Sequence, residues 1–347
     1  MIRFLAMRSI ILVVSFLGIA HAGDLPEIRI VSSVQEIVTL YEQAGYWGEL
    51  EPDKILQVPP ILAVATVKQW RQEAAEMTVE DKKELFYRSL LPLVLYSNNA
   101  IIEEREKLLD IIERHPDLSI GNEADVSWIL DLGIHYRLIK VLEGESPVLP
   151  EGQSLKDFLS NLLDRVDTIP ASLALGQGAY ESGYGTSRFA LEGNSYFGQW
   201  TYDGKGMSPK KKRASKGNYG VAAYEWPLDS VRSYMLNLNT HRAYSDLRTK
   251  RAHLRNQAKA VTGEALAQTL TSYSERGMDY VKSLTGMMRF NQLGAADKAE
   301  LIESPPVLIV NAADEQDAVA VAAGISALRA SGELARLVES MGIDKLQ

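Results

Sequence analysis

The chain has 347 residues and a net charge of -8, which leaves room for about two compact units and argues against a whole-protein affinity for nucleic acid. Hydrophobic residues make up 46% and charged residues 24% of the chain, so neither extensive disorder nor a polytopic membrane protein fits the composition. The absence of cysteine excludes disulfides, thiolate nucleophiles and cysteine-based metal sites.

Residues 1–22 have the pattern of a secretory signal peptide. Arg3 and Arg8 form a positive flank, residues 10–20 are apolar, and an Ala-His-Ala cleavage motif precedes Gly23. An uncleaved membrane anchor is the alternative, but this apolar stretch falls well short of the roughly twenty residues that span a bilayer. We therefore expect cleavage, export to the periplasm or the extracellular space, and no stable membrane insertion of the mature chain.

The stretch 24–143 is predicted to form a helical N-terminal region. Helical periodicity is clearest over 98–115, where Pro116 enforces a stop. Thr78 followed by Asp81 is a capping pattern that opens another helix. The side chains expected on the inner face of the first of these helices are Ile101, Ile102, Arg105, Leu108, Leu109 and Ile112.

A second unit, 150–293, is predicted to be mainly α with a small β-element. It opens with a helix over 155–166, and Thr168 can cap the next helix, which ends at Gly183 and Gly185. The later segments are predicted as short strands at 195–200 and 219–224, and as helices at 228–239, 263–272 and 279–293.

The C-terminal segment 294–347 is rich in Ala, Asp and Glu, with nine acidic side chains against four basic ones. Alanine is the best helix former, so part of this segment, 318–338, is able to form a helix. We expect a loosely attached acidic tail that is partly helical or disordered.

The usual cofactor and hydrolase motifs are missing. The run Gly-Tyr-Gly after Ser182 begins like a dinucleotide loop, but Arg188 stands where the third glycine belongs. Ser182 forms no nucleophile elbow, because Tyr180 stands where the strained turn needs a small residue. The histidines of the mature chain show no i, i+4 pairing, and they are His115, His135, His241 and His253. We predict neither a metal nor a cofactor.

Glu181, at the end of the helix that Thr168 opens, is the strongest candidate for chemistry. Glycines inside a helix each cost about 1 kcal/mol relative to alanine, so Gly176 and Gly178 indicate a close approach by another part of the chain. The helix C-terminus and desolvation by Tyr184 and Phe197 are expected to raise the pKa of Glu181 above about 4.3. A carboxylic acid that stays protonated near neutral pH can act as the general acid of glycosidic cleavage, although the spacing alone also fits a solvated helix end.

Two segments around this glutamate carry a family resemblance. They are Ala179-Tyr180-Glu181-Ser182-Gly183-Tyr184-Gly185 and Asn194-Ser195-Tyr196-Phe197-Gly198. The pair resembles the signature of the glucosaminidase domain of glycoside hydrolase family 73, with weaker similarity at 221–224, 229–231 and 273–280. More narrowly, residues 90–293 resemble the Bax-like exported proteins, which carry this domain behind a helical region.

The resemblance implies a lysozyme-like, mainly helical domain that cuts peptidoglycan glycan strands after N-acetylglucosamine, as an endo-acting enzyme. It places Glu181 as the general acid, and Tyr273 and Tyr280 as candidates for an essential tyrosine. The residues expected to bind substrate are Tyr184, Asn194, Tyr196, Phe197, Gly198, Trp200 and Tyr224.

The chain departs from the family in two places. Many members carry a second acidic residue on the β-element, whereas 204–224 contains no Asp or Glu, and the nearest acids are Asp203 and Glu225. We therefore favour a single-acid mechanism, in which the substrate's N-acetyl group or a water meets the oxocarbenium-like transition state. The tyrosine element is also one residue longer than expected, which leaves the choice between Tyr273 and Tyr280 open.

The loop between the two predicted strands is basic and contains Lys205, Lys210, Lys211, Lys212, Arg213 and Lys216. It is either a solvated hairpin tip or an electrostatic guide for the carboxylates of peptide stems and muramic acid. Two other functions stay open: a muramidase or lytic transglycosylase with the same acid, and a glycan-binding or scaffold protein that does not cut. The sequence indicates no oligomeric state.

Overall fold

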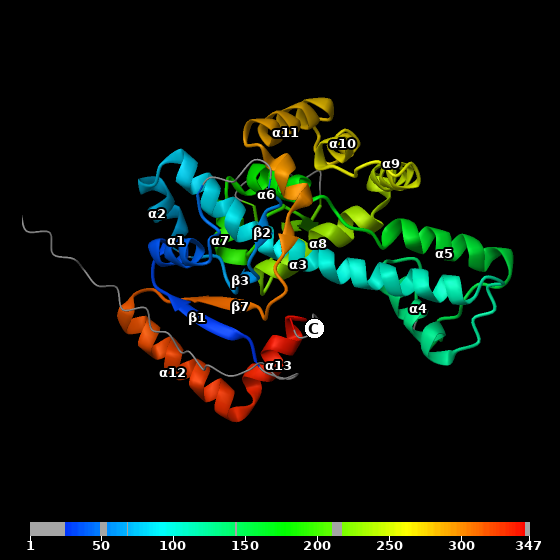
Figure 1. Ribbon diagram of the computed structural model, residues 1–347, viewed down its shortest axis with the longest axis horizontal. Helices are drawn as coiled ribbons and strands as arrows, with labels where there is room; N and C mark the ends of the chain where they lie inside the picture. The colour runs from blue at the N-terminus through cyan, green and yellow to red at the C-terminus, as the bar shows by residue number, and fades with distance from the viewer. Residues whose placement is uncertain (1–24, 49–53, 68, 143, 210–216, 344–347) are drawn as a thin grey trace, which may run out of the picture.

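The computed structural model describes residues 25–48, 54–67, 69–142, 144–209 and 217–343, and its fold is mainly α, as predicted (Figure 1). The predicted signal peptide and basic positions 210–213 and 216 lie outside these residues. The first helices are α1 (Val34–Gln43), α2 (Trp70–Glu76), α3 (Val79–Arg114), α4 (Glu123–His135), α5 (Gln153–Arg165), α6 (Ala171–Ser182) and α7 (Arg188–Gly193). The later ones are α8 (Pro227–Thr240), α9 (Ser245–Asn256), α10 (Gly263–Ala267), α11 (Met278–Phe290), α12 (Glu315–Ser331) and α13 (Glu333–Ser340).

The strands are short and form three small sheets within the described residues. They are β1 (Glu27–Val31), β2 (Gln57–Val58), β3 (Ile61–Ala63), β4 (Trp200–Thr201), β5 (Gly220–Val221), β6 (Glu300–Leu301) and β7 (Val307–Asn311). β1, β7 and β3 form a parallel sheet in that order, in which Val307 lies between Glu27 and Ile61. β2 pairs with β6, and β4 pairs with β5 as the small antiparallel element expected there.

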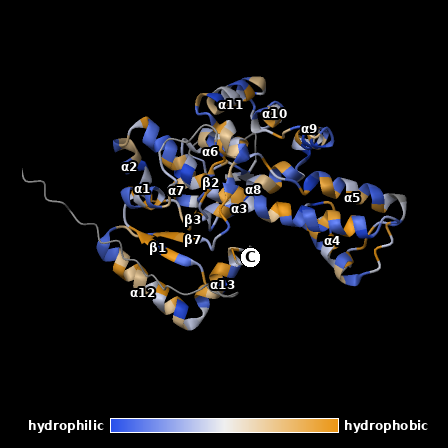
Figure 2. Cartoon of the chain, viewed as in Figure 1, coloured by the Kyte–Doolittle hydropathy of each residue, from blue (hydrophilic) through white to orange (hydrophobic). Residues whose placement is uncertain are grey.

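The expectation of a loosely attached tail is wrong, because the C-terminal segment completes the core. β7 is the central strand of the parallel sheet, and Leu334, Val338 and Ile343 are buried in the main hydrophobic cluster. β1 and β3 were likewise not expected in a region predicted to be helical. β3 and β7 are short apolar runs, typical of a buried parallel sheet, and β7 is coloured mostly hydrophobic in Figure 2. β1 instead alternates charged and apolar residues and buries Ile28, Ile30 and Val31. The acidic, alanine-rich composition of the C-terminal segment comes mainly from α12, which has no buried residue. This composition led to the expectation of a loose tail.

α3 is a helix of 36 residues, about 54 Å long at 1.5 Å per residue, and it joins two parts of the molecule. It unites both helices predicted over this stretch, with Pro92 buried inside it. The Thr78 hydroxyl accepts a hydrogen bond from the Asp81 amide at 3.1 Å, as the capping pattern predicts. In Figure 1 the second half of α3 extends with α4 and α5 to the right, away from the sheet.

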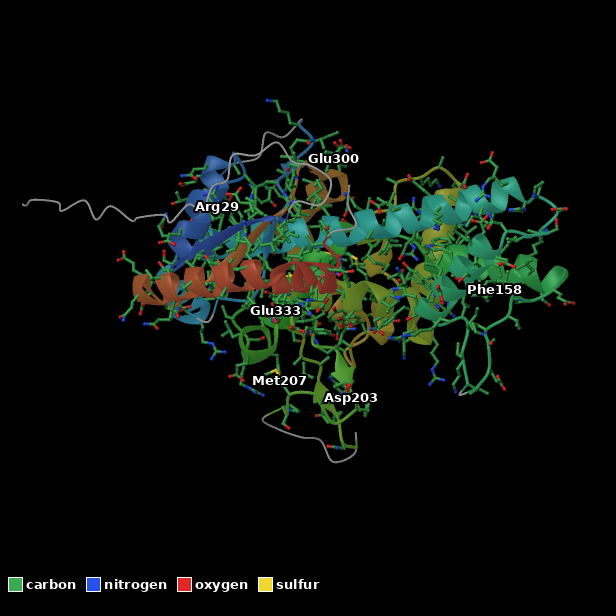
Figure 3. All side chains as sticks on the ribbon, turned by 90° about the horizontal axis from the view of Figure 1, so that it is seen from below. Arg29, Phe158, Asp203, Met207, Glu300 and Glu333 are labelled. Atoms are coloured by element: carbon green, nitrogen blue, oxygen red, sulfur yellow. The ribbon has the colours of Figure 1, made fainter. Side chains whose placement is uncertain are left out.

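This extension, called the arm here (residues 99–166), has a hydrophobic core of its own. Its buried side chains are Leu108, Ile111, Ile129, Leu132, Tyr136, Leu155, Phe158, Leu159, Leu162 and Val166. Leu108 is buried as expected, but Ile102 and Leu109 are 40% and 44% exposed, because α4 and α5 cover the face that holds Ile111. Figure 3 places Phe158 of the arm and Arg29 of β1 toward opposite ends of the molecule.

Among the described residues, no single helix has the length and apolar composition to cross a membrane. The pair α12 and α13, bent by 97° relative to each other, meets the length and composition requirement only when the two are taken together.

A buried ionic cluster fixes the base of the arm to the rest of the protein. Asp167, which is 2% exposed, lies 3.3 Å from Nε of the fully buried Arg251 and 2.5 Å from Nη2 of Arg255. Arg251 also donates to three backbone carbonyls within 164–168, and Arg105 of α3 donates to two carbonyls nearby. Burial lowers the pKa of Arg251 to about 10. The Asp167 carboxylate, just before α6, thus forms ion pairs with arginines of α9 and, at 4.0 Å, with Arg105 of α3.

Replacement of this carboxylate tests its importance. Asp167→Asn keeps the shape of the side chain but leaves the Arg251 charge buried and unpaired, so we expect a loss of about 3–5 kcal/mol in unfolding free energy. Urea unfolding of the full chain measures it. The control is Asp110→Asn, which removes an exposed ion pair with Arg114 and should leave the urea midpoint unchanged. Equal effects of the two substitutions would contradict the assignment.

Candidate active site

α6 is packed closely by other helices on two sides. A Cβ atom at Gly176 would stand 2.7 Å from Cγ of Met288 in α11. A Cβ atom at Gly178 would stand 2.7 Å from Cδ2 of Leu90 in α3. The close approach predicted from these glycines is confirmed, and it makes α6 the central helix between the N-terminal region and α11.

The turn that follows α6 is left-handed over 183–185, with φ angles of 58°, 57° and 75°. This conformation costs a non-glycine residue such as Tyr184 about 1–2 kcal/mol. Two side chains of α2 hold the turn: Trp70 Nε1 donates to the Tyr184 carbonyl and Arg71 Nε donates to the Thr186 carbonyl, both at 2.9 Å. The N-terminal region therefore stabilises the backbone next to the candidate acid.

Glu181 has an exposed side chain, although nearly all of α6 before it is buried. The Tyr280 hydroxyl lies near its carboxylate, and Oε2 lies 3.8 Å from the position that a Cβ of Gly198 would take. Desolvation by the surrounding protein raises the pKa of Glu181, while the nearby Tyr280 hydroxyl lowers it. The direction of the net shift agrees with the prediction.

The two candidate tyrosines lie together beside this acid. The rings of Tyr273 and Tyr280 are stacked, with centroids 5.5 Å apart and planes 10° from parallel. Burial, followed by the nearby negative charge of Glu181, raises the pKa of the Tyr280 hydroxyl. Burial also raises the pKa of Tyr273, whose hydroxyl donates to the Phe197 carbonyl at 3.1 Å. Tyr280 therefore lies near the acid, whereas Tyr273 holds the segment that passes it.

Asn194 and Tyr196 hold this segment to the N-terminal region. Oδ1 of Asn194 accepts from the amide and the hydroxyl of Thr66, both at 3.0 Å. Nδ2 of Asn194 donates to the carbonyls of Tyr224 and Glu225, at 3.1 and 2.9 Å. The Tyr196 hydroxyl is 2.7 Å from the Thr66 hydroxyl. Because protein partners occupy the whole Asn194 amide, its geometry favours a supporting role over the expected direct contact with sugar.

Phe197 also supports rather than contacts a ligand. Its ring is 2% exposed and is stacked on Tyr234, with centroids 3.9 Å apart, so no face is left for a sugar. Tyr184 is half-buried and packs edge-on against aromatic rings of α3. Gly198, with φ of 62°, is the part of the segment whose backbone passes beside Glu181.

The β-element carries the remaining aromatic residues predicted to bind substrate. Trp200 is 46% exposed, and its ring is stacked on Tyr219 at 4.7 Å. Tyr224 is half-buried, and its hydroxyl donates to Gln199 Oε1 at 2.8 Å and lies 3.1 Å from the Ser233 hydroxyl. Trp200 therefore offers a more open aromatic surface than the other rings in the predicted set.

The acids nearest in sequence to the β-element do not join Glu181. Asp203 lies in the turn after β4, at the lower side of Figure 3, where its Oδ1 accepts from the Lys205 amide at 2.8 Å. Glu225 is exposed, and its carbonyl accepts from Asn194. Neither Asp203 nor Glu225 contributes to the pKa shift of Glu181. Among the described residues, no other carboxylate contributes to the pKa shift of Glu181, and the single-acid mechanism stays a prediction.

Sequence reasoning missed two buried polar residues behind the site. Gln177 Nε2 donates to the Tyr280 hydroxyl at 2.9 Å, and the Tyr234 hydroxyl donates to Gln177 Oε1 at 2.7 Å. Gln177 lies four residues before Glu181, so the shared helix face was a usable signal. Tyr234 comes from α8, and no local pattern connects it to Glu181.

Glu181 lines neither of two cavities of about 70 and 380 Å³. The smaller one is bounded by the parallel sheet, α1 and α3, and the larger one lies at the start of α6. Within the described ranges, no group of three or more His, Asp or Glu side chains has the arrangement of a metal site.

Comparison with known proteins shows which family this chain resembles. The Glucosaminidase family, described as mannosyl-glycoprotein endo-beta-N-acetylglucosaminidase, matches residues 159–293, which include Glu181, Tyr273 and Tyr280. Protein bax of Escherichia coli (strain K12) is 32% identical over 211 residues, covering 61% of this chain and 70% of that protein. No solved structure matches the chain at a significant level.

The packing of α6 gives a stability test with a matched control. Gly176→Ala places a methyl group against the buried Met288, so despite the better helix propensity of alanine we expect a net loss of roughly 1–2 kcal/mol. Gly286→Ala, in α11, meets no atom within 4 Å and should gain about 0.5–1 kcal/mol. Thermal unfolding compares the two, and a stabilised Gly176 variant would show that α6 is not tightly enclosed.

Proposed function

Since the chain belongs to the Bax-like family of proteins with a glucosaminidase domain, we propose that it is an exported glycosidase that cuts peptidoglycan glycan strands. We propose that it cleaves the glycosidic bond after N-acetylglucosamine, at internal positions of the strand, and is thus an endo-β-N-acetylglucosaminidase. The observation that carries the proposal is the exposed Glu181 at the end of α6, with a pKa raised by desolvation and with the Tyr280 hydroxyl nearby.

The proposed mechanism uses one acid. Protonated Glu181 donates its proton to the glycosidic oxygen as the bond to the leaving sugar breaks. The Tyr280 hydroxyl then stabilises the carboxylate that forms, because a hydrogen bond to a charged acceptor is stronger than one to a neutral acceptor. The substrate's N-acetyl group or a water attacks the oxocarbenium-like transition state. Tyr273 lies near Glu181.

Two further features support a polymeric, anionic substrate. The Glu181 side chain is exposed, so a long glycan strand can lie across it and be cut internally. The basic positions 205, 210–213 and 216 provide positive charge that favours the carboxylates of peptide stems and muramic acid. The predicted signal peptide over 1–22 would bring the enzyme to peptidoglycan.

Removal of the proton donor is the direct test of this function. Glu181→Gln keeps the size of the side chain and loses the proton, so release of soluble fragments from purified peptidoglycan should fall at least about 100-fold. The control is Glu192→Gln, in α7, which changes an exposed glutamate paired with Arg188 and should keep full activity. Unchanged activity in the Glu181 variant would rule out its role as the acid.

Mass analysis of the products identifies the bond. N-acetylglucosamine at the new reducing ends supports the proposal. N-acetylmuramic acid ends identify a muramidase, and anhydromuramic ends identify a lytic transglycosylase. Binding of peptidoglycan without any cleavage, equal in the wild type and in Glu181→Gln, identifies a glycan-binding protein.

The raised pKa of Glu181 predicts that both activity and stability decrease as pH rises. Activity needs protonated Glu181, so kcat/KM should decline as pH rises through a pKa above the usual value of about 4.3. The folded state also holds this proton more tightly than the unfolded state, so ionised Glu181 reduces stability as pH rises from the usual pKa to the raised one. At pH 7, Glu181→Gln should therefore unfold thermally at or above the wild-type midpoint. A clearly lower midpoint would contradict this sign.

A further inference from the structure

We propose that Arg276 is a specificity-determining residue, which binds a free carboxylate of the peptide stems while Glu181 acts on the glycan strand. The inference deepens the proposed function and rests on it. Arg276 is exposed and lies just before α11, between the two candidate tyrosines in the chain. Its guanidinium belongs to a set of contacts that also reaches the surroundings of the acid.

The Tyr180 side chain connects Arg276 to the last turn of α6. Nη1 of Arg276 donates to the Tyr180 hydroxyl, and Tyr180 directly precedes Glu181 in the chain. Nη2 of Arg276 donates to Oγ of Ser283 in α11 at 3.2 Å. The Ser283 hydroxyl in turn donates to the Asp279 carbonyl at 2.8 Å, so it is fixed as an acceptor for the arginine. Partners on two helices therefore hold the guanidinium in one orientation.

A row of aromatic rings continues from Tyr180 to the backbone that passes the acid. The Tyr180 ring meets Tyr280 edge-on, with centroids 5.3 Å apart, and Tyr280 is stacked on Tyr273. The Tyr273 hydroxyl donates to the Phe197 carbonyl, directly before the glycine whose backbone lies beside the carboxylate. Two routes therefore link Arg276 to the acid: the chain of α6 and this row of rings.

Arg276 keeps hydrogen-bonding capacity for an anion. Both of its partners among the described residues are neutral hydroxyls, and no carboxylate there pairs with it. Other exposed arginines, such as Arg114 and Arg289, are paired with carboxylates of this chain. A guanidinium has five N–H donors in a rigid, planar arrangement, so the two bonds leave donors free. An oriented guanidinium of this kind fits a carboxylate, which it can bind through two parallel hydrogen bonds.

The position of this charge suits a general acid. A cation next to Glu181 would favour the ionised carboxylate and lower its pKa. Arg276 does not contribute to the pKa shift of Glu181, so its charge can attract a substrate without removing the catalytic proton. Peptide stems branch from the glycan strand, so their carboxylates lie to the side of the bond that is cut. A cation beside the acid, rather than on it, matches this arrangement.

A substrate without free carboxylates provides the direct test. Carbodiimide coupling to methylamine converts the carboxylates of peptidoglycan to neutral amides and leaves the glycan strand in place. On native peptidoglycan, Arg276→Gln should raise KM about five- to tenfold, with kcat changed less than about twofold, because a charge-assisted contact made on binding is lost. On the amidated substrate, the wild type and Arg276→Gln should have the same KM. Release of soluble fragments measures both constants.

A conservative variant and a control separate recognition from a structural role. Arg276→Lys keeps the charge but not the planar fork, so its KM on native peptidoglycan should lie between those of the wild type and Arg276→Gln. Arg289→Gln removes an equal charge from an exposed position in α11 and should leave KM unchanged on both substrates. An arginine that only supported the end of α6 would lower kcat equally on both substrates when replaced. That result, or an equal rise of KM on both substrates, would overturn the inference.

The inference and the proposed function can fail separately. If the wild type does not cut glycan, the proposed function fails, and titration calorimetry with soluble disaccharide-peptide fragments of peptidoglycan decides the inference. Weaker binding by Arg276→Gln than by the wild type, with no such difference for the amidated fragments, supports carboxylate recognition. Equal affinities for the native fragments, or no binding by either protein, would overturn it.

Discussion

The enclosure of α6 is the physical constraint on which the candidate site depends. Helix interiors tolerate glycine poorly, yet Gly176 and Gly178 are needed because α11 and α3 each approach to a distance that a Cβ atom would obstruct. The helix is consequently buried along nearly its whole length and reaches the surface only at its last turn, where Glu181 lies. The N-terminal region contributes one of the two enclosing helices, so it is part of the support of the acid.

Buried polar groups fix α6 in a way that apolar packing alone does not. At its start, the Asp297 carboxylate accepts from the amide and the hydroxyl of Ser172, and also from the amide of Gly263 at the start of α10. Closer to its end, Gln177 takes part in a directed chain of hydrogen bonds. An unpaired polar group in a protein interior is costly, so each of these bonds favours one position of the helix over neighbouring ones. Precise placement of the acid therefore follows from satisfying the polar groups behind it.

Local sequence signals predicted the features that depend on neighbours in the chain. The helical class, the Thr78 cap, the close approach at Gly176 and Gly178 and the direction of the Glu181 pKa shift all follow from nearby residues. Features that depend on distant partners were missed or misjudged. The Asn194 amide is occupied by Thr66, 128 residues earlier in the chain, and nothing around Asn194 indicates that partner. The apolar run of β7 was hidden in an acidic, alanine-rich context, and its pairing with β1 spans almost the entire described chain.

The place of β7 in its sheet bears on the order in which the molecule can form. A ribosome makes β1 and β3 first, and each has its sheet partner only in a strand that is synthesised near the end. Pairing across such a separation is slow because the intervening chain must first be closed into a loop. Until the last forty or so residues are available, both early strands keep open edges, which are sites of unwanted association. A truncated product that stops after α11 would retain Glu181 and both tyrosines but would lack the strand that joins the two ends of the fold.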